Sequence, residues 1–142
     1  LGDVYKRQED CGIRQIALEN HGMQLVYNPE TLFRLREAVG PLVGMNLDPS
    51  HLFWMGGDPI EAARVLGERD ALYHVHGKDS RPERRMAGPN GLLDTKPIDQ
   101  FRTRSWNYVP WAAATVPSGG RSFSPPCGWP AMTATCRWKW RI

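Results

Sequence analysis

Three short, mainly apolar runs, each followed by a polar side chain, are the most regular feature of the chain. They occupy residues 13–18, 42–47 and 71–75. Apolar runs of this length, bounded by polar residues and turn signals, are typical of strands buried in a parallel sheet. The polar residues that close the runs are Glu19, Asp48 and His76.

An amphipathic segment at residues 28–40 separates the first two runs. Asn28 is placed as the N-cap, Pro29 at the first helical position and Gly40 as the stop. The pattern predicts a helix whose apolar stripe consists of Leu32, Leu35 and Val39.

Residues 58–67 repeat this pattern, with Asp58 as the N-cap, Pro59 at the first helical position and Gly67 as the stop. Strand, helix, strand, helix and strand in this order indicate parallel βα units. The sequence therefore predicts an α/β fold. The expected apolar face of the second helix consists of Ile60, Ala63 and Leu66.

The polar residues at the ends of the three runs keep a regular spacing. Glu19 and Asp48 are 29 residues apart, and Asp48 and His76 are 28 residues apart. Because a βα repeat takes about 30 residues, each predicted strand ends in one candidate ligand at the same level of the sheet. In a (β/α)8 barrel that level is the C-terminal rim, where active sites lie. Two carboxylates and an imidazole that converge there would suit a divalent cation such as Mn²⁺, Mg²⁺, Co²⁺ or Zn²⁺.

Each of these residues also has an ordinary structural interpretation. A single polar residue at a strand end commonly caps a helix or bonds a loop, and Asp48 before Pro49 could fix its own turn. His74 and His76 lie on the same face of a strand, so their spacing leaves open which of them binds a ligand. The side chains at residues 53–55 are expected to pack in the interior, although a sugar can lie on an aromatic face.

Composition places the chain among ordinary globular proteins. It has 142 residues, of which 41% are hydrophobic and 23% charged, as in one modest domain. It contains no signal-peptide pattern and no apolar run of the about 18 residues that a membrane-spanning helix needs. A cytoplasmic protein with no membrane partner is therefore expected. Neither a zinc ribbon nor a disulfide scaffold is supported by the spacing of Cys11, Cys127 and Cys136.

Charge divides the chain at residue 110. All 15 acidic residues lie at or before Asp99, whereas residues 110–142 hold four cations, five of the 12 prolines and four of the six tryptophans. A basic, aromatic segment could bind nucleic acid, but this one has no lysine or arginine run, so no nucleic-acid partner is predicted. The segment fits no helix or strand period.

Several motifs together resemble a known family. IALENH, GMNLDPSHLFWMGGDP and YHVHGKDS, in this order and spacing, are similar to the sugar phosphate isomerase/epimerase family, which has the xylose isomerase-like TIM barrel. NGLLDTKP and RSWNYV also resemble segments of its isomerase/epimerase branch. The resemblance covers roughly residues 9–109, and the superfamily also includes endonuclease IV.

The resemblance implies a barrel with one catalytic divalent metal ion and four ligands, of which Glu19, Asp48 and His76 match the first three. In this family a metal-bound glutamate, matched by Glu19, takes a proton from a carbon next to a carbonyl, and a second glutamate returns it. The cation acts as a Lewis acid and stabilises the enediolate. His51 matches a histidine that contacts the substrate or supports a ligand, and Lys78 lies where it could reach a hydroxyl or phosphate. The expected substrate is a small-molecule sugar or sugar phosphate.

Other functions stay open beside the isomerase or epimerase. One is a metal-dependent dehydratase, that is a lyase, of a keto-inositol-like polyol. Another is an endonuclease IV-like DNA repair enzyme, although that resemblance implies a multi-zinc site richer in histidine than a chain with four histidines offers. A third is a non-catalytic binding module or an inactive fragment, because one ligand and half of the barrel are missing from the printed chain.

The resemblance also divides the chain into three segments. Residues 9–109 are expected to form a partial TIM barrel of about three to four βα units, because a whole barrel needs about 250 residues. Residues 1–8, LGDVYKRQ, are interpreted as an artefactual leader of translated adapter sequence, or else as a genuine N-terminal tail. Residues 110–142 are interpreted as a frameshifted, disordered tail.

The genetic code supports the frameshift interpretation. If one base is lost near Val109, each later codon is read one base late, so an original codon is the third base of one displayed codon plus the first two bases of the next. At some places the genetic code then allows a single original residue. Three of these are alanine from Trp129–Pro130, aspartate from Met132–Thr133 and glutamate from Trp138–Lys139. Lys139 lies 63 residues after His76, about two βα steps, which leaves room for one barrel strand near Trp106. The missing fourth ligand is therefore expected as a glutamate in another reading frame at Lys139.

Overall fold

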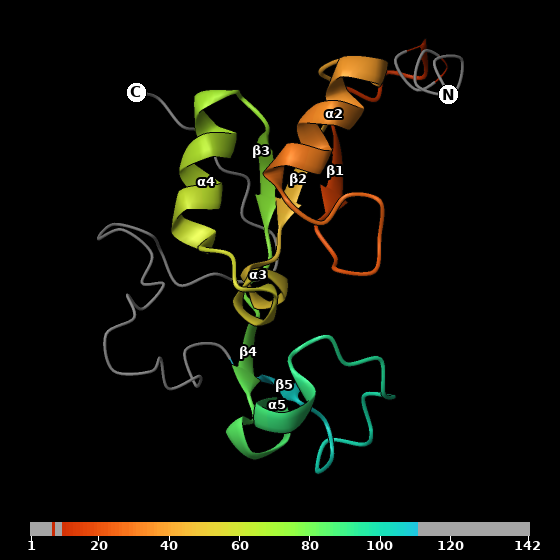
Figure 1. Ribbon diagram of the computed structural model, residues 1–142. Helices are drawn as coiled ribbons and strands as arrows, with labels where there is room; N and C mark the ends of the chain where they lie inside the picture. The colour runs from red at the N-terminus through yellow and green to blue at the C-terminus, as the bar shows by residue number, and fades with distance from the viewer. Residues whose placement is uncertain (1–6, 8–9, 111–142) are drawn as a thin grey trace.

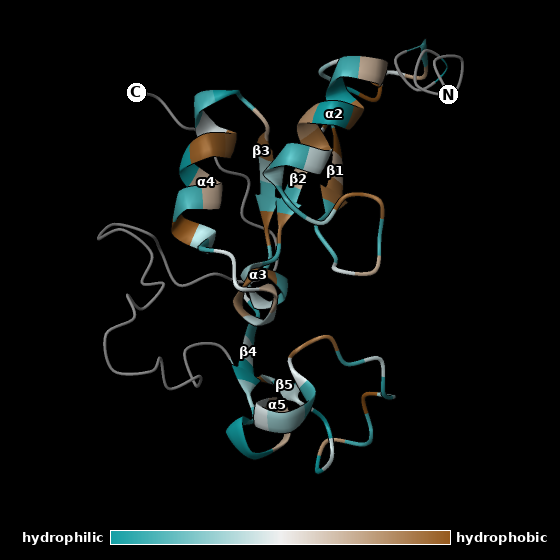
Figure 2. Ribbon diagram, in the orientation of Figure 1, coloured by the Kyte–Doolittle hydropathy of each residue, from teal (hydrophilic) through white to brown (hydrophobic). Residues whose placement is uncertain are grey.

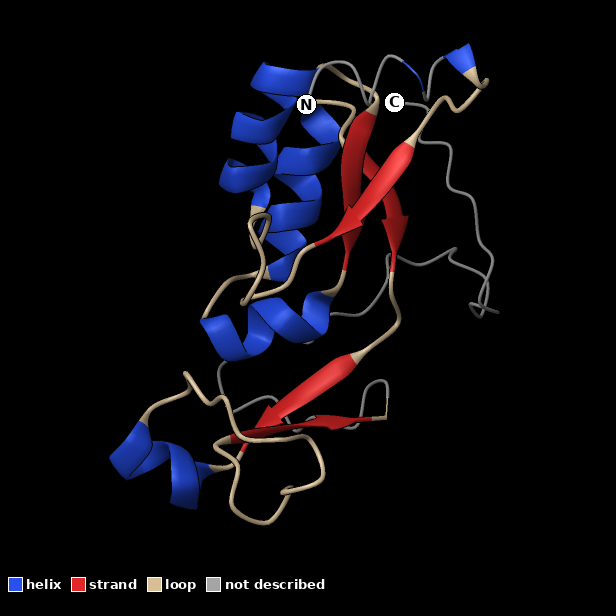
Figure 3. Ribbon diagram, turned by 90° about the vertical axis from the view of Figure 1, so that its right-hand side faces the viewer, coloured by secondary structure: helices blue, strands red, loops and turns tan. Residues whose placement is uncertain are grey.

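A three-stranded parallel sheet forms the centre of the computed structural model, which describes residue 7 and residues 10–110. The strands lie in the order β1-β2-β3, and α2 and α4 lie together on one side of the sheet (Figures 1 and 3). The predicted succession of parallel βα units is confirmed. The elements are β1 (Ile16–Glu19), α2 (Pro29–Val39), β2 (Val43–Leu47), α4 (Pro59–Glu68) and β3 (Leu72–Val75).

Helix α2 begins and ends where the sequence predicts. Asn28 Oδ1 accepts a hydrogen bond from the backbone N–H of Thr31 at 2.9 Å, and Thr31 Oγ1 accepts one from the backbone N–H of Asn28 at 3.2 Å. This reciprocal pair satisfies donors that the first turn would otherwise leave unpaired. Gly40 ends the helix with φ 86°, a conformation that a side chain would strain. Leu32 is fully buried, while Leu35 and Val39 are partly buried against the core.

Replacing Asn28 by alanine is expected to lower the free energy of unfolding by about 1 kcal/mol, because the Oδ1 acceptor for the backbone N–H of Thr31 is lost. Urea unfolding followed by circular dichroism would show a lower midpoint with an unchanged slope. Glu30→Gln is the matched control, because the Glu30 ion pair with Arg34 is exposed and such pairs contribute little. Equal midpoints for Asn28→Ala and Glu30→Gln would contradict the assigned capping role.

Helix α4 begins at its predicted N-cap, but its predicted end is wrong. Asp58 Oδ1 accepts from the backbone N–H of Ile60 at 2.8 Å, as expected. The helix continues through Gly67, its predicted stop, to Glu68, and Asp70 then adopts the left-handed conformation with φ 47°. Aspartate tolerates this conformation better than most residues.

The buried face of α4 also differs from the prediction. It consists of Pro59, Ala62 and Leu66, whereas Ile60 lies outside the core cluster. Apolar and polar bands alternate along the helix in Figure 2. The three predicted positions lie on one face of the helix by their spacing, but contact of α4 with β2 and β3 decides which face of the helix is buried. The core cluster comprises Val26, Leu32, Val43, Met45, Leu47, Leu52, Ala62, Leu66, Ala71 and Val75.

A short helix, α3 (Pro49–Met55), follows β2 where the sequence was interpreted as a turn. Asp48 is its N-cap, and Gly56, with φ 82° and ψ 15°, is its left-handed C-cap. Trp54 is buried, which confirms its prediction as a packing residue. The signal was present in the sequence, since Asp48 precedes Pro49 as Asp58 precedes Pro59.

A separate antiparallel pair of strands lies beyond the C-terminal ends of the parallel sheet, with α3 between them (Figure 1). Strand β4 (Asp79–Pro82) pairs with β5 (Trp106–Val109), and α5 (Arg84–Asn90) lies between them in the chain. The prediction of a barrel strand near Trp106 is therefore wrong, although a strand is present. No helix separates β3 from β4, so the chain leaves the parallel sheet after β3.

Stacked tryptophans join this unit to α3. The rings of Trp54 and Trp106 are 4.9 Å apart and inclined by 4°, and each residue is about 5% exposed. The loop before β5 is held by Asp94, whose Oδ2 accepts from the backbone N–H of Ser105 at 2.6 Å and from Lys96 Nζ at 2.7 Å. The unit formed by β4, α5 and β5 is called the outer hairpin below.

The segments predicted as a leader and as a frameshifted tail fall almost wholly outside the described residues, as does the predicted glutamate at Lys139. Among the described residues, no helix is both long and apolar enough to cross a membrane.

Candidate metal centre

Glu19, Asp48 and His76 converge at the C-terminal ends of the three parallel strands. One ligand atom from each lies within 4.8 Å of the other two. Glu19 is the last residue of β1, Asp48 directly follows β2, and His76 directly follows β3. Among the described residues, this is the one group of three or more His, Cys, Asp and Glu side chains that could hold a metal ion.

The three residues do not lie at one level of the sheet, contrary to the sequence prediction. Glu19 pairs with Asn46, which is two residues before Asp48. Parallel strands in a barrel are staggered, so equal spacing along the chain does not give equal height. The side chain of Glu19 spans the difference, since its Oε1 lies 3.0 Å from His76 Nδ1.

Asp48 is held rigidly and is fully buried. Its Oδ1 accepts hydrogen bonds from the backbone N–H of Ser50 at 2.9 Å and from Ser50 Oγ at 2.6 Å. The buried Asn20 amide bonds both the N–H and the C=O of the Asp48 backbone, at 2.6 and 3.0 Å. Burial opposes ionisation of Asp48, but the Ser50 bond and the nearby Lys78 charge outweigh it and lower the pKa of the carboxyl.

Lys78 places a positive charge on the same two carboxylates. Its Nζ lies 3.0 Å from Glu19 Oε1 and 2.9 Å from Asp48 Oδ2. Although burial alone would lower it, the pKa of Lys78 is raised by its hydrogen bonds and by the charges of Asp48 and Glu19. Lys78, predicted as a substrate contact, thus lies inside the candidate metal site, and its side chain is about half exposed.

These residues fit a divalent cation. Asp48 Oδ2 is buried, and it faces Lys78 Nζ at 2.9 Å rather than a backbone or hydroxyl donor. An oxygen of this kind retains lone pairs that a cation could use, and carboxylate and imidazole ligands suit Mn²⁺, Co²⁺, Zn²⁺ or Mg²⁺. The exposed ammonium could leave the carboxylates for water when a cation binds.

Comparison with known proteins agrees with this geometry. The family described as xylose isomerase-like TIM barrel matches residues 1–112. The chain belongs to this family. It is therefore a partial TIM barrel, and the family includes isomerases, epimerases and related enzymes that act on small molecules and often bind a metal ion.

Two curated relatives are much longer than the matched segment. The chain is 64% identical over 106 residues to "Uncharacterized protein YfiH" of Bacillus subtilis (strain 168), a match that covers 75% of this chain and 33% of YfiH. It is 31% identical over 93 residues to "Rhizopine catabolism protein MocC" of Rhizobium meliloti, covering 66% of this chain and 28% of MocC. The chain thus spans about a third of the length of these xylose isomerase-like relatives.

His51, the remaining predicted site residue, lies beside the candidate metal centre on α3. It is 1% exposed, and its Nε2 is 3.8 Å from both Glu19 Oε1 and Asp48 Oδ2. Burial lowers the pKa of His51, which the charges of Asp48 and Glu19 only partly offset, so the neutral ring is favoured at neutral pH. His74 lies close to His76, with ring centroids 5.6 Å apart, but it is not part of the three-residue cluster.

Two aromatic residues next to His51 were missed by the sequence analysis. The His21 ring lies 4.2 Å from that of His51, and the Tyr108 ring lies 6.0 Å away, edge to face. Burial and the charge of Asp48 raise the pKa of Tyr108. A signal for Tyr108 existed, because alternation along β5 puts Tyr108 on the same face as Trp106.

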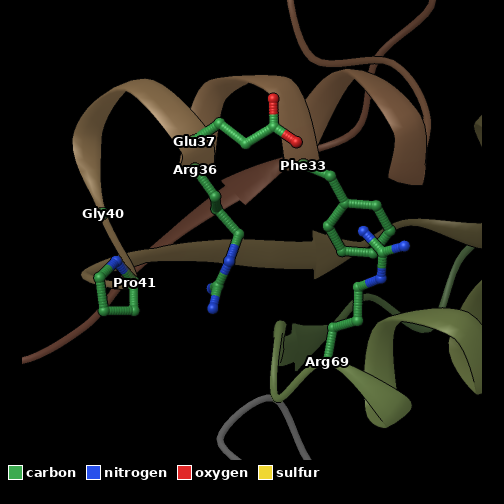
Figure 4. Close-up of a pocket in the computed structure, with 6 residues that line it drawn as sticks. All are labelled: Phe33, Arg36, Glu37, Gly40, Pro41 and Arg69. Atoms are coloured by element: carbon green, nitrogen blue, oxygen red, sulfur yellow. The ribbon is translucent and has the colours of Figure 1, made fainter.

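A pocket elsewhere in the structure is separate from the candidate metal centre. It has a volume of about 280 Å³ and lies between α2 and the turn after α4 (Figure 4). The Arg69 guanidinium covers the Phe33 ring at 4.2 Å, and Arg36 donates to the backbone oxygen of Val43 at 2.6 Å. These arginines are engaged in packing at the N-terminal end of the sheet. The lining residues are Phe33, Arg36, Glu37, Gly40, Pro41 and Arg69.

Proposed function

We propose that this chain contributes three metal ligands of a divalent-metal-dependent sugar or sugar-phosphate isomerase or epimerase. The observation that carries the proposal is the convergence of Glu19, Asp48 and His76 at the C-terminal ends of parallel strands. In barrels of this type the catalytic residues come from the ends of several strands. The substrate would be a small polyhydroxy carbonyl compound rather than DNA.

Glu19, Asp48 and His76 would hold the cation, with a fourth ligand from outside the described residues. A bound divalent cation would polarise the substrate carbonyl and so acidify the neighbouring C–H. Mn²⁺, Mg²⁺, Co²⁺ and Zn²⁺ are all compatible with two carboxylates and an imidazole.

Glu19 is the residue we assign as the general base. Its side chain is 35% exposed, whereas that of Asp48 is fully buried and fixed by Ser50. Of these two carboxylates, Glu19 is therefore the one that can reach a substrate carbon without a rearrangement of α3. It would take the proton from the carbon next to the carbonyl, and the enediolate would be reprotonated at another position or from the other face.

His51 and Lys78 would orient the substrate. The neutral His51 ring, which contacts His21 and Tyr108, is buried, so it would offer a hydrogen bond to a substrate oxygen when one of these two side chains moves aside. The ammonium of Lys78, displaced from the carboxylates, would bind a hydroxyl or phosphate oxygen. The same proton abstraction would begin the dehydratase reaction, so the two activities differ only in whether the enediolate is reprotonated or loses a hydroxyl group as water.

A longer chain is needed to test the proposal, and YfiH can supply it, because the match covers only 33% of YfiH. In a chimera, the matched segment of this chain would replace the corresponding 106 residues of YfiH. We expect about one equivalent of Mn²⁺ after EDTA treatment and reloading, and incorporation of solvent deuterium next to the carbonyl of a keto-sugar, followed by NMR. Loss of water from a keto-inositol without sugar exchange would favour the dehydratase. A chimera that folds but binds no divalent cation would overturn the proposed function.

A further inference from the structure

Tyr108 is a partly exposed side chain that the outer hairpin brings to the candidate metal centre. Its ring lies 6.0 Å from the His51 ring, edge to face, and His51 Nε2 lies 3.8 Å from both Glu19 Oε1 and Asp48 Oδ2. His51 is 1% exposed, whereas Tyr108 is 37% exposed. Of these two residues, Tyr108 is therefore the one that an entering molecule can contact without a rearrangement.

Packing against α3 fixes the position of Tyr108. Side chains alternate along a strand, so Tyr108 and Trp106 lie on the same face of β5, with ring centroids 5.2 Å apart. Trp106 in turn stacks on Trp54 of α3. Gly22 lies so close to Trp54 that a Cβ there would be 2.4 Å from the indole ring. Tyr108 is thus held by packing that extends through α3 to the loop after β1, as a binding residue needs to be.

The Tyr108 hydroxyl makes no hydrogen bond with the described residues. The Tyr73 hydroxyl, by contrast, donates to the backbone oxygen of Pro41 and is used in packing. Burial and the charge of Asp48 raise the pKa of Tyr108, so its hydroxyl stays protonated at neutral pH and can donate. A partly exposed phenol with an unused donor and acceptor, beside a candidate active site, is suited to bind a hydroxyl group.

We propose that Tyr108 is a specificity-determining residue whose hydroxyl binds a hydroxyl group of the sugar away from its carbonyl. The carbonyl end would lie at the metal ligands, and the single imidazole ring of His51 links these ligands to Tyr108, a separation similar to the length of a small sugar. The inference rests on the proposed function. It adds the kind of group that is recognised, an uncharged hydroxyl, because tyrosine offers an apolar ring and a neutral polar tip to the C–H and O–H groups of a sugar.

Tyr108→Phe removes the hydroxyl and keeps the ring contacts with Trp106 and His51. It is expected to weaken the binding of D-ketohexoses by about 3- to 10-fold, the contribution of one neutral hydrogen bond. Tyr27→Phe is the matched control, because Tyr27 is 42% exposed and lies before the N-cap of α2. It should leave the affinity unchanged.

Sugar analogues separate a direct contact from a structural effect. The tightest-binding ketohexose is compared with its monodeoxy analogues by saturation-transfer NMR titration of the 142-residue chain and of a YfiH chimera that includes β5, both with Zn²⁺ added. The analogue that lacks the contacted hydroxyl is expected to bind the unsubstituted protein and Tyr108→Phe equally, because the hydrogen bond is already lost. A merely structural role of the hydroxyl would weaken the binding of every analogue alike. Circular dichroism of each variant monitors the fold.

Two kinds of failure are distinguishable. Isothermal titration with Zn²⁺ should give the same affinity for the unsubstituted protein and for Tyr108→Phe. If neither binds Zn²⁺, the proposed function fails, while the sugar affinities still test Tyr108. The inference about Tyr108 would be overturned by equal ketohexose affinities of the two proteins, by the absence of any ketohexose binding, or by an equal loss of affinity for all the deoxy analogues.

Discussion

Asp48→Asn in the YfiH chimera is expected to reduce divalent-cation affinity by about 100-fold or more. The substitution keeps the shape of the side chain and the oxygen that accepts from Ser50, so α3 retains its N-cap. It removes the negative charge of the fully buried Asp48 carboxylate, which lies 3.5 Å from His76 Nδ1, and leaves Glu19 as the other carboxylate of the cluster. Loss of one partner from a buried charged group costs about 3 to 5 kcal/mol, which corresponds to this change in affinity.

Asp58→Asn is the matched control for this prediction. Asp58 is also an aspartate N-cap before a proline, but it is exposed and lies outside the metal-ligand cluster. Its substitution is expected to leave cation affinity unchanged in isothermal titration. Equal affinities of Asp48→Asn and the unsubstituted protein, with both folded, would remove Asp48 from the ligand set.

Trp106→Ala is expected to have the largest effect on stability. The substitution removes the ring that stacks on Trp54 at 4.9 Å and contacts Tyr108 at 5.2 Å. Truncation of a buried tryptophan typically costs about 3 to 5 kcal/mol, a large part of the total stability of a domain. We expect the outer hairpin to separate from α3 and to expose the amides of β4 and β5.

Urea unfolding and hydrogen exchange would measure this effect. Amides of β4 and β5 should exchange much faster in Trp106→Ala, while amides of β2 keep most of their protection. Trp106→Phe should restore much of the stability, because an aromatic ring remains and the buried, unpaired indole N–H is removed. Phe101→Ala, at a 59% exposed aromatic of the same unit, should change little. Equal exchange in Trp106→Ala and Phe101→Ala would refute the role of the stack.

Helix positions were predictable because their signals are local. Asn28 with Pro29, and Asp58 with Pro59, identify helix starts through bonds between residues two or three apart. The same pattern at Asp48 and Pro49 indicated α3, and it was missed because the segment of seven residues is too short to show a clear apolar stripe. The end of α4 was placed too early because Gly67 was taken as the stop, whereas the left-handed residue after the helix is Asp70.

The outer hairpin was not predictable from spacing. A strand near Trp106 was expected from the length of a βα repeat, but its partner is β4 and the pairing is antiparallel. Which strand pairs with which is decided by contacts far apart in the sequence, here the stack of Trp54 on Trp106. Strand propensity alone carries no information about such a partner.

For the candidate metal centre, the sequence by itself determined three side chains and the end of the sheet where they meet, because parallel βα units bring successive strand ends to one edge. The tertiary structure alone decided how they meet: Glu19 lies opposite Asn46 rather than Asp48, and Lys78 lies on both carboxylates. It also placed Tyr108 beside His51. These contacts join residues on different elements, and strand stagger and packing, which no local pattern encodes, set their distances.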